Sequence, residues 1–313
     1  MAYRIVKEKD IMHGIERAVS ELEGAFSLCI ATAEGHLFAV RDPNGFRPLC
    51  LGKGENGIIV ASESSAVEAC GFEFLRDVQP GETVIIKNGE IIASIQTKKE
   101  KNKELGLCIF EYVDFARPDS AIDNLSVYEA RINMGKILFE EHRAEAEIVC
   151  GVPDSGLDAA IGYASASGLP LVNGFVKNRY IGRSFIYPTQ DMRLSAVRLK
   201  LNPLRASIEG KRVVLVDDSI VRGTTSEKIV KSLKAAGAKE VHLRISSPPF
   251  VYTCCYGTVI DSMENLIANR MSLEGICRKI GANSLGYISM EGLKRACNKC
   301  TISFCSVCFT GYS

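Results

Sequence analysis

The sequence has 313 residues, of which 46% are hydrophobic and 24% charged, a mixture that excludes a disordered chain, a collagen-like fibre and a coiled-coil rod. At about 150 residues per domain, this length predicts two domains. The net charge of +1 gives no global positive field, so we expect neither nucleic acid nor an anionic membrane as a partner.

The N-terminal residues 1–14, MAYRIVKEKDIMHG, have no apolar core of a secretory signal. No apolar run in the chain reaches the length of about 18 residues that favours a membrane-spanning helix. We therefore expect a cytoplasmic protein.

The first hundred residues predict a β-rich unit. Residues 11–24 have the apolar spacing of a helix and end in glycine. Short apolar or alternating segments, separated by turn sequences such as DPNG and KNGE, then predict strands over residues 25–32, 36–40, 57–62 and 82–95. The lysine-rich stretch 97–106, TKKEKNKELG, predicts a linker that marks a domain boundary, with a solvated loop as the alternative.

The rhythm then changes to alternating helices and strands. Helical spacing predicts helices over 128–142, 156–168 and 224–237, and apolar runs predict strands over 146–153, 169–176, 212–218 and 239–249. Residues 265–297 read as helical with one short strand. This alternation favours a parallel, doubly wound α/β sheet. We predict domains at 1–100 and 101–296, and a cysteine-rich tail at 297–313.

The twelve cysteines are many for a reducing compartment, where structural disulfides are rare. Most lie alone in apolar surroundings and read as small buried hydrophobes. The run CNKCTISFCSVC at 297–308 differs, because four thiols in twelve residues favour a metal or iron–sulfur site. Its spacing is too tight for a zinc ribbon, which leaves open that one pair binds with ligands from distant segments.

The loop after the strand at 212–218 carries the strongest chemistry. Paired carboxylates, Asp217 and Asp218, end the strand, and a polar turn, 219–225, leads into a helix. Loop N–H groups and a helix N-terminus favour a phosphate, while the carboxylates suit sugar hydroxyls or Mg²⁺. Together they indicate a phosphorylated ribose. The alternative is a solvated acidic turn before a capped helix.

The stretch VVLVDDSIVRGTTSEKI resembles the motif for phosphoribosyl diphosphate (PRPP) in the glutamine phosphoribosyl-diphosphate amidotransferases, or amidophosphoribosyltransferases, of the iron–sulfur bacterial type. CIFEYVDFARPDS, SVYEARINMGKIL, GVPDSG, GFVKNRYIGRSFIYPTQDMR and CFTG resemble the same family in its order, and RDPNGFRPL and ASESSAVEACG resemble the later part of its glutaminase domain. The implied fold is α/β. A type I phosphoribosyltransferase parallel sheet flanked by helices follows a β-rich remnant of an N-terminal-nucleophile glutaminase domain.

The implied reaction is the Mg²⁺-dependent displacement of pyrophosphate from PRPP by ammonia. It gives 5-phosphoribosylamine, in the first step of de novo purine biosynthesis. GVPDSG at 151–156 matches the pyrophosphate loop, where we expect a strained or cis peptide. KNRYIGR at 177–183 matches the flexible loop that closes over PRPP, with Lys177 and Arg179 as its catalytic cations. The implied PRPP ligands are Asp154, Ser155, Asp217, Asp218, Ser219, Val221, Arg222, Gly223, Thr224 and Thr225. Those implied for Mg²⁺ are Ser155, Asp217 and Asp218.

The resemblance also implies a [4Fe–4S] cluster with a structural role. Its ligands match four cysteines in three segments, namely Cys108, Cys254, Cys305 and Cys308. Three further cysteines near these positions are left without a role: Cys255, Cys297 and Cys300.

The sequence departs from the family pattern in its glutaminase part. Members begin with a catalytic cysteine, whereas this sequence begins MAYRIVK, and its first cysteine, Cys29, lies in a predicted strand. We therefore expect no glutamine hydrolysis by this chain, and ammonia either from solution or from a separate glutaminase subunit. Asp114 stands where an aromatic residue is common, and Asn124 where glycine is usual.

Two other functions are weighed. A nucleobase phosphoribosyltransferase would share the PRPP motif, but the cysteine set and the KNRYIGR segment argue against it. A PRPP-binding regulatory module, or an inactive fragment, would keep the site without turnover. The resemblance further implies purine nucleotides as inhibitors and a homo-oligomer as the assembly.

Overall fold

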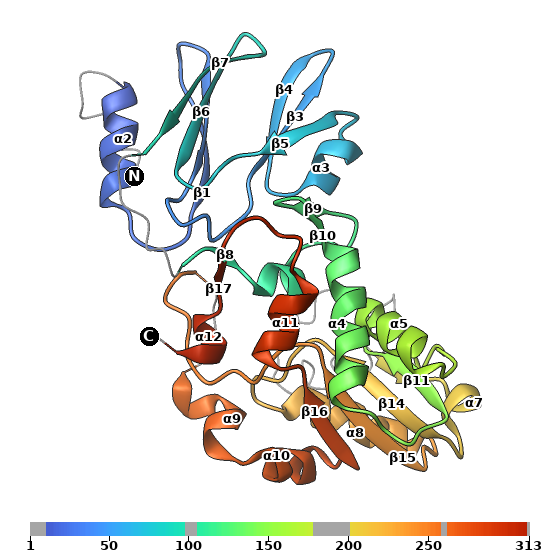
Figure 1. Cartoon of the computed structure of the whole chain (residues 1–313). Helices are drawn as coiled ribbons and strands as arrows, with labels where there is room; N and C mark the ends of the chain where they lie inside the picture. The colour runs from blue at the N-terminus through green and yellow to red at the C-terminus, as the bar shows by residue number, and fades with distance from the viewer. Residues whose placement is uncertain (1–10, 98–104, 178–200, 258–261, 312–313) are drawn as a thin grey trace, which may run out of the picture. The chain divides into compact units, whose positions relative to one another are not determined.

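The computed structural model describes residues 11–97, 105–177, 201–257 and 262–311 (Figure 1). The chain forms two compact units. Unit 1 comprises 1–127, 254–259 and 299–307, and unit 2 comprises 128–253, 260–298 and 308–313. These are units of packing, and the domain limits at residues 100 and 296 stay a prediction.

Unit 1 contains two antiparallel sheets. The first has the order β1-β2-β6-β7, with β1 (Ser27–Ala31), β2 (His36–Arg41), β6 (Glu82–Lys87) and β7 (Glu90–Gln96). The second has the order β4-β3-β5, with β3 (Cys50–Gly54), β4 (Gly57–Ala61) and β5 (Glu73–Asp77). Helices α2 (Ile11–Glu21) and α3 (Ser64–Ala69) complete this part. The predicted helix at 11–24 and the four predicted strand regions are confirmed.

The period-two alternation of β2 explains the layers of unit 1. Phe38 and Val40 share one apolar cluster with Ile15 and Val19 of α2. The residue between them, Ala39, belongs to a second cluster with Leu49, Leu51 and Val78. The first sheet is therefore covered by α2 on one face and by residues of the second sheet's region on the other.

The sequence prediction missed β3 and β5. Glycines in CLGKG resemble a turn, but Gly52 lies where a Cβ would come within 2.3 Å of a Val67 side-chain carbon, so close packing requires glycine. In β5 the first three residues are exposed, the fourth is half-buried and the fifth is buried. The strand therefore lacks the usual alternation of buried and exposed side chains.

Unit 1 also contains two pairs of two-residue strands and a π-helix. β8 (Leu107–Cys108) pairs in parallel with β17 (Phe304–Cys305), and β9 (Ala121–Ile122) pairs antiparallel with β10 (Leu125–Ser126). A π-helix, η1 (Glu111–Phe115), follows β8. At the β9–β10 turn, Asn124 has φ +68°, a conformation that favours glycine.

Unit 2 is built on a parallel sheet of order β11-β14-β15-β16. The strands are β11 (Ile148–Gly151), β14 (Arg212–Asp217), β15 (Glu240–Ile245) and β16 (Ser284–Tyr287). Side chains of α8 (Thr224–Ala235) and α10 (Leu273–Ile280) share one core cluster with these strands. α5 (Gly156–Ser167) packs on β11 and β14. The α/β prediction is confirmed.

The predicted strand at 169–176 is wrong in its extent. Only a single parallel bridge joins Leu171 to Val149 of β11. The chain then forms β12 (Phe175–Lys177), which pairs antiparallel with β13 (Leu201–Pro203) in a separate two-stranded sheet. The apolar run alone could not show this, because a continuous strand and a bridge followed by a second strand have the same composition.

The remaining elements are helices α4 (Val127–Glu141), α7 (Arg205–Ile208), α9 (Ile267–Arg270), α11 (Met290–Ala296) and α12 (Val307–Thr310), with a short 3₁₀ turn, η3 (Met263–Asn265). The predicted helical character of 265–297 with one strand is confirmed. In the described part of the chain, each helix is too short or too polar to cross a membrane.

Candidate functional site

Two strand-to-helix loops of unit 2 meet at one edge of the parallel sheet. β14 ends at Asp217, which is 6% exposed and whose carbonyl accepts a hydrogen bond from the Ser246 N–H at 3.0 Å. β11 ends at Gly151, and the GVPDSG loop then enters α5. Across the two loops, Ser155 Oγ donates to Asp218 Oδ1 at 2.9 Å. Residues 63 positions apart in sequence are thereby placed together.

Glycine permits this close approach of the two loops. Gly156 begins α5 directly against β14, and a Cβ there would lie 2.5 Å from the Val216 carbonyl oxygen. The Val152 N–H donates to the same carbonyl at 2.8 Å. The Pro153–Asp154 peptide is cis, which confirms the predicted strained or cis peptide in this loop.

The meeting point lies where the chain changes direction across the sheet. After β11, the chain first makes its bridge at Leu171 on one side of β11, and β14 then pairs on the other side. Open α/β sheets bind ligands at the carboxyl ends of strands at such a switch point. Ser155, Asp217 and Asp218 all lie at this position.

The other predicted PRPP ligands follow Asp218 in the same loop. Ser219 Oγ donates to Asp218 Oδ2 at 2.7 Å, and the Val221 carbonyl accepts from the Ile267 N–H at 2.9 Å. Gly223 has φ +79° as the N-cap of α8. Arg222, Thr224 and Thr225 are exposed. The loop backbone is therefore hydrogen-bonded to the rest of unit 2 at Val221, while Arg222 and the two threonines are exposed.

The basic segment at 177–183 is described only at its start. Lys177 forms an ion pair with Asp154 of the GVPDSG loop, which brings a predicted catalytic cation to the predicted pyrophosphate loop. Arg179 lies outside the described residues, so its role stays a prediction.

Three of the four predicted cysteine ligands lie in unit 1. Cys108 and Cys305 are register partners on β8 and β17. Cys254 accepts a hydrogen bond on its Sγ from the Tyr256 N–H at 3.4 Å, and it interacts electrostatically with Cys305. Cys308, on α12, belongs to unit 2, so its position relative to the other three stays a prediction.

Two of these thiols are affected by burial. Burial raises the pKa of the Cys108 thiol to about 12, and it also raises the pKa of Cys305. Among the residues that the structure describes, no three Cys, His, Asp or Glu side chains form a group that could hold a metal ion. A cluster of four irons separates its ligand sulfurs more widely than one ion does, because each sulfur binds a different iron.

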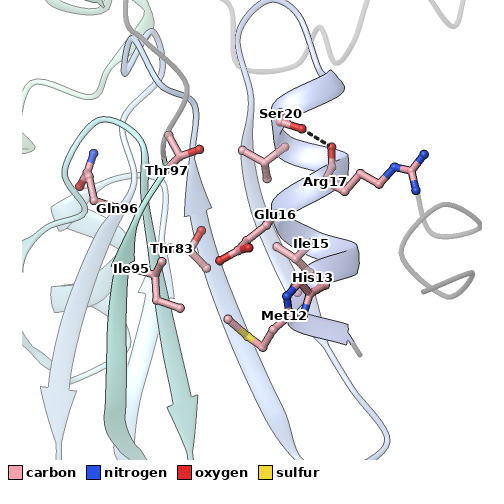
Figure 2. Close-up of a pocket in the computed structure, with 11 residues that line it drawn as sticks. Met12, His13, Ile15, Glu16, Arg17, Ser20, Thr83, Ile95, Gln96 and Thr97 are labelled. Carbon is pink, nitrogen blue, oxygen red and sulfur yellow. Dashed lines mark hydrogen bonds between the residues drawn. The ribbon is translucent and has the colours of Figure 1, made fainter. Parts of the chain in front are cut away.

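A cavity of about 430 Å³ lies elsewhere in unit 1, between α2 and the first sheet (Figure 2). Met12, Ile15 and Glu16 of the helix face Thr83 and Ile95 of the strands. None of the residues predicted to bind PRPP or a metal lines it.

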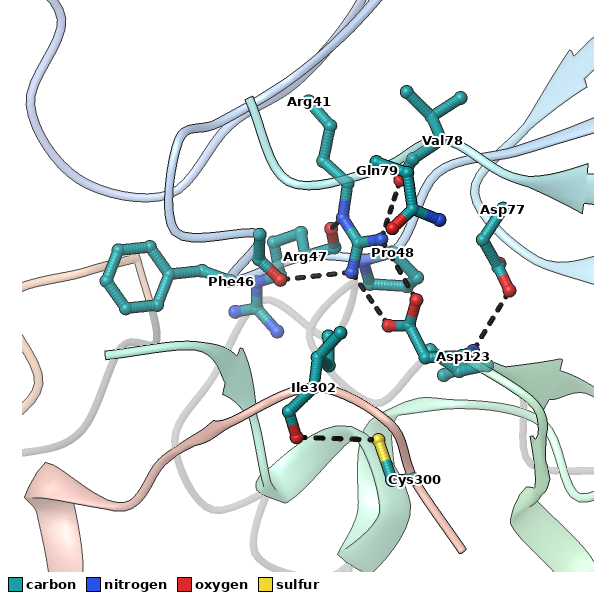
Figure 3. A network of polar contacts seen from close by, with 12 residues as sticks. Arg41, Phe46, Arg47, Pro48, Asp77, Val78, Gln79, Asp123, Cys300 and Ile302 are labelled. Carbon is teal, nitrogen blue, oxygen red and sulfur yellow. Dashed lines mark hydrogen bonds and ion pairs between the residues drawn. The ribbon is translucent and has the colours of Figure 1, made fainter. Parts of the chain in front are cut away.

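Sequence reasoning missed a buried ion pair in unit 1. Arg41 is 0% exposed, and its guanidinium donates to both carboxylate oxygens of Asp123 at 3.1 and 3.4 Å (Figure 3). The Asp123 N–H donates in turn to Asp77 at 3.0 Å. Burial, with the neighbouring Asp123 charge, raises the pKa of Asp77 to about 6. The only signal in the sequence was Arg41 itself, a charged residue that ends an apolar strand.

Comparison with known proteins places both parts of the chain. A glutamine amidotransferase domain model matches residues 3–69, and a phosphoribosyl transferase domain model matches residues 124–246. The amidophosphoribosyltransferase of Methanocaldococcus jannaschii is 46% identical, over 98% of this chain and 67% of the relative. The chain belongs to the amidophosphoribosyltransferase family.

Other amidophosphoribosyltransferases agree with this placement. The one from Archaeoglobus fulgidus is 49% identical, over 98% of this chain and 66% of the relative. A solved glutamine PRPP amidotransferase from Bacillus subtilis, complexed with ADP and GMP, is 44% identical with a TM-score of 0.90, over 99% of this chain and 69% of that one. The chain thus spans about two thirds of the length of these family members.

Proposed function

We propose that this chain transfers the phosphoribosyl group of PRPP to ammonia with Mg²⁺, giving 5-phosphoribosylamine and pyrophosphate, in the first step of de novo purine synthesis. The observation that carries the proposal is the contact between Ser155 and Asp218 at the switch point of the parallel sheet. It joins a loop of the phosphate-binding type to a pair of carboxylates. The membership of the family supports the same reaction.

The loop residues and the carboxylates of the site have different roles in the reaction. In the reaction, the ammonia lone pair forms a bond to C1 of the ribose, the bond from C1 to the diphosphate oxygen breaks with its electrons, and the new ammonium group releases a proton. The loop from Ser219 to Thr225 offers N–H groups and hydroxyls to the ribose phosphate. Asp217 and Asp218 accept hydrogen bonds from ribose hydroxyls. Their negative charges stabilise the positive charge that develops on the ring.

The oxygen donors suit a divalent cation. Mg²⁺ prefers carboxylate and hydroxyl oxygens, and Ser155, Asp217 and Asp218 present these at one edge of the sheet. When bound there, Mg²⁺ would neutralise charge on the diphosphate leaving group. Lys177 is paired with Asp154 in the structure. Its ammonium group can exchange this carboxylate for the diphosphate of PRPP.

The cysteine set suits an iron–sulfur cluster. Cys108, Cys254 and Cys305 supply three thiols from one unit, and Cys308 is the fourth proposed ligand. A [4Fe–4S] cluster would cross-link β8, β17 and the 254–257 turn, which is a structural role. Because burial raises the pKa of Cys108, uptake of iron must release protons from neutral thiols.

The partners follow from the same reading. We propose that the protein is a cytosolic homo-oligomer. We also propose that purine nucleotides inhibit it, because the Bacillus subtilis relative was solved with ADP and GMP.

The test is pyrophosphate release by the purified 313-residue chain, kept anaerobic. PRPP and Mg²⁺ are given with ammonium chloride, with glutamine, or with adenine as a nucleobase acceptor. We expect release with ammonium and none with adenine. Release with adenine only would show a salvage enzyme. Binding of PRPP without any release would show a regulatory module or an inactive fragment. Release with glutamine would show that the chain also hydrolyses glutamine.

A further inference from the structure

The loop after β2, with the sequence RDPNGFRP, is fixed by its own first two residues. The backbone N–H groups of residues 44–46 donate to the Asp42 carboxylate at 2.7 to 3.0 Å. The Arg41 guanidinium donates to the carbonyls of Gly45 and Arg47 at 3.1 and 2.9 Å. Asp42 and Arg41 are both 0% exposed. The next two side chains, Phe46 and Arg47, are therefore presented from a rigid turn (Figure 3).

Phe46 contacts the segments that carry three predicted cluster ligands. Its carbonyl accepts from the Cys108 N–H at 3.0 Å. Its ring stacks on Tyr256, with centroids 4.5 Å apart, and the Tyr256 N–H donates to Cys254 Sγ. Phe46 and Cys305 share one apolar cluster.

Arg47 brings a positive charge to the same place. One guanidinium nitrogen donates to Glu111 Oε1 at 2.5 Å, and the other donates to the Gly257 carbonyl at 3.2 Å. Burial lowers the pKa of Arg47, but the hydrogen bond and ion pair with Glu111 raise it overall, with smaller electrostatic contributions from Cys108 and Cys254. The guanidinium is thus held between η1, which begins three residues after Cys108, and the 254–257 turn, which contains Cys254.

We propose that Arg47 is the charge-compensating positioning residue of the cysteine site, which holds the 254–257 turn in place and offsets the negative charge of the thiolate-bound cluster. The inference rests on the cluster proposed above. A [4Fe–4S] cluster with four thiolates carries net negative charge, and nearby charges and hydrogen bonds set its reduction potential. Groups that orient metal ligands also contribute to metal retention.

The ion pair allows a test with opposite signs. Arg47→Gln removes the cation and leaves Glu111, so the cluster becomes harder to reduce and its potential falls. Glu111→Gln removes the anion and leaves Arg47, so the potential rises. A role in packing alone would move both variants in the same direction. Arg47→Lys keeps the charge and should restore most of the wild-type behaviour.

A matched control exists in the same unit. Arg76 pairs with Glu82 at 2.7 Å, with side chains 36% and 6% exposed, against 26% and 7% for Arg47 and Glu111. Arg76 donates to the Asp77 carbonyl and to both carboxylate oxygens of Glu82, and neither residue is a predicted cluster ligand. Arg76→Gln should leave both the potential and the iron content unchanged.

The experiment is anaerobic reconstitution of the full chain with ferrous iron and sulfide. Iron per chain, the rate of iron loss to a chelator and the reduction potential are measured for each variant, with circular dichroism to check folding. We expect Arg47→Gln to lose iron about tenfold faster. Equal potentials in Arg47→Gln and the unmodified chain, or shifts of one sign in both ion-pair variants, would overturn the inference. If Arg47→Gln does not fold, the sign of the Glu111→Gln shift decides.

The iron content of the unmodified chain separates a failure of the cluster assignment from a failure of the role of Arg47. If the unmodified chain takes up no iron and sulfide, the cluster assignment fails and the role of Arg47 fails with it. If the unmodified chain forms a cluster that is indifferent to both charges, only the role of Arg47 fails.

Discussion

The candidate phosphoribosyl site of unit 2 and the candidate cysteine site of unit 1 are assembled differently. The first consists of two continuous loops, 151–156 and 217–225, that each follow a strand and enter a helix. The second collects single residues from segments near 108, 254 and 305, on two-residue strands and a turn. A site made of continuous loops leaves a motif in the sequence. A site made of scattered residues leaves only its reactive side chains.

The difference also concerns what supports each site. The loops of unit 2 begin at the ends of strands that are buried on both faces, so the parallel sheet fixes their position. The cysteines of unit 1 depend on polar contacts from a distant turn, the one that carries Phe46 and Arg47. Four predictions, in order of expected effect, test this contrast.

The largest effect is expected at the carboxylates of unit 2. Asp218→Asn should lower the rate of pyrophosphate release by about two to three orders of magnitude, because it removes a negative charge that stabilises the positive ribose ring in the transition state. Glu147→Gln is the control, since Glu147 accepts from the Arg212 N–H at the opposite end of the same strand, β14. Release by Asp218→Asn within a few-fold of wild type would remove Asp218 from the site.

The next effect concerns the cysteine site. Cys108→Ser should reduce iron per chain by at least about tenfold, because losing a ligand costs more than losing a group that orients one. Cys277→Ser is the control, because Cys277 is also partly buried but donates to the Ala282 carbonyl in unit 2. Iron and sulfide analysis of both variants after reconstitution measures this. Equal iron in the two would show that Cys108 is not a ligand.

A smaller effect tests how closely the two loops of unit 2 must approach. Gly156→Ala should destabilise unit 2 by about 1–3 kcal/mol, because the overpacking against the rigid β14 backbone exceeds the gain of about 1 kcal/mol in helix propensity. It should also weaken PRPP binding. Gly168→Ala at the other end of α5 meets no atom within 4 Å and has φ +72°, so it should cost some stability and leave binding intact. Calorimetric melting and PRPP titration separate the two.

The last effect is of similar size but appears only in part of the pH range, in unit 1. The pKa of Asp77 rises from 3.8 to about 6 in the folded state, so the folded state holds this proton more tightly. The stability that results is present below about pH 4 and is lost as the pH rises through 6. Asp77→Asn keeps an oxygen for the Asp123 N–H and removes this loss. Between pH 4.5 and 7 it should gain about 1–3 kcal/mol relative to wild type, measured as the difference in melting temperature at each pH. Parallel curves for the two proteins would contradict the assignment.

Much of the architecture was predictable because local patterns agreed with the fold. The helix at 11–24 and the strands at 146–153 and 212–218 follow apolar periodicity, and the structure confirms them. The failures have physical causes. β3 contains glycines that packing demands, β5 has an exposed pattern, and the run at 169–176 splits into a bridge and a new sheet. In each case tertiary contacts override local preference.

The sequence by itself determined the order of the elements and the motifs, and it predicted roles for Asp217, Asp218 and the four cysteines, because these can be read as residue types in recognisable motifs. Only the tertiary structure decided which of them meet. The contact of Ser155 with Asp218 and the pairing of Cys108 with Cys305 join residues far apart in the chain. The same holds for Arg41 with Asp123 and for Arg47 with Glu111. Such contacts depend on strand order and on the packing of turns, which are global properties of the fold and leave no periodic trace along the chain.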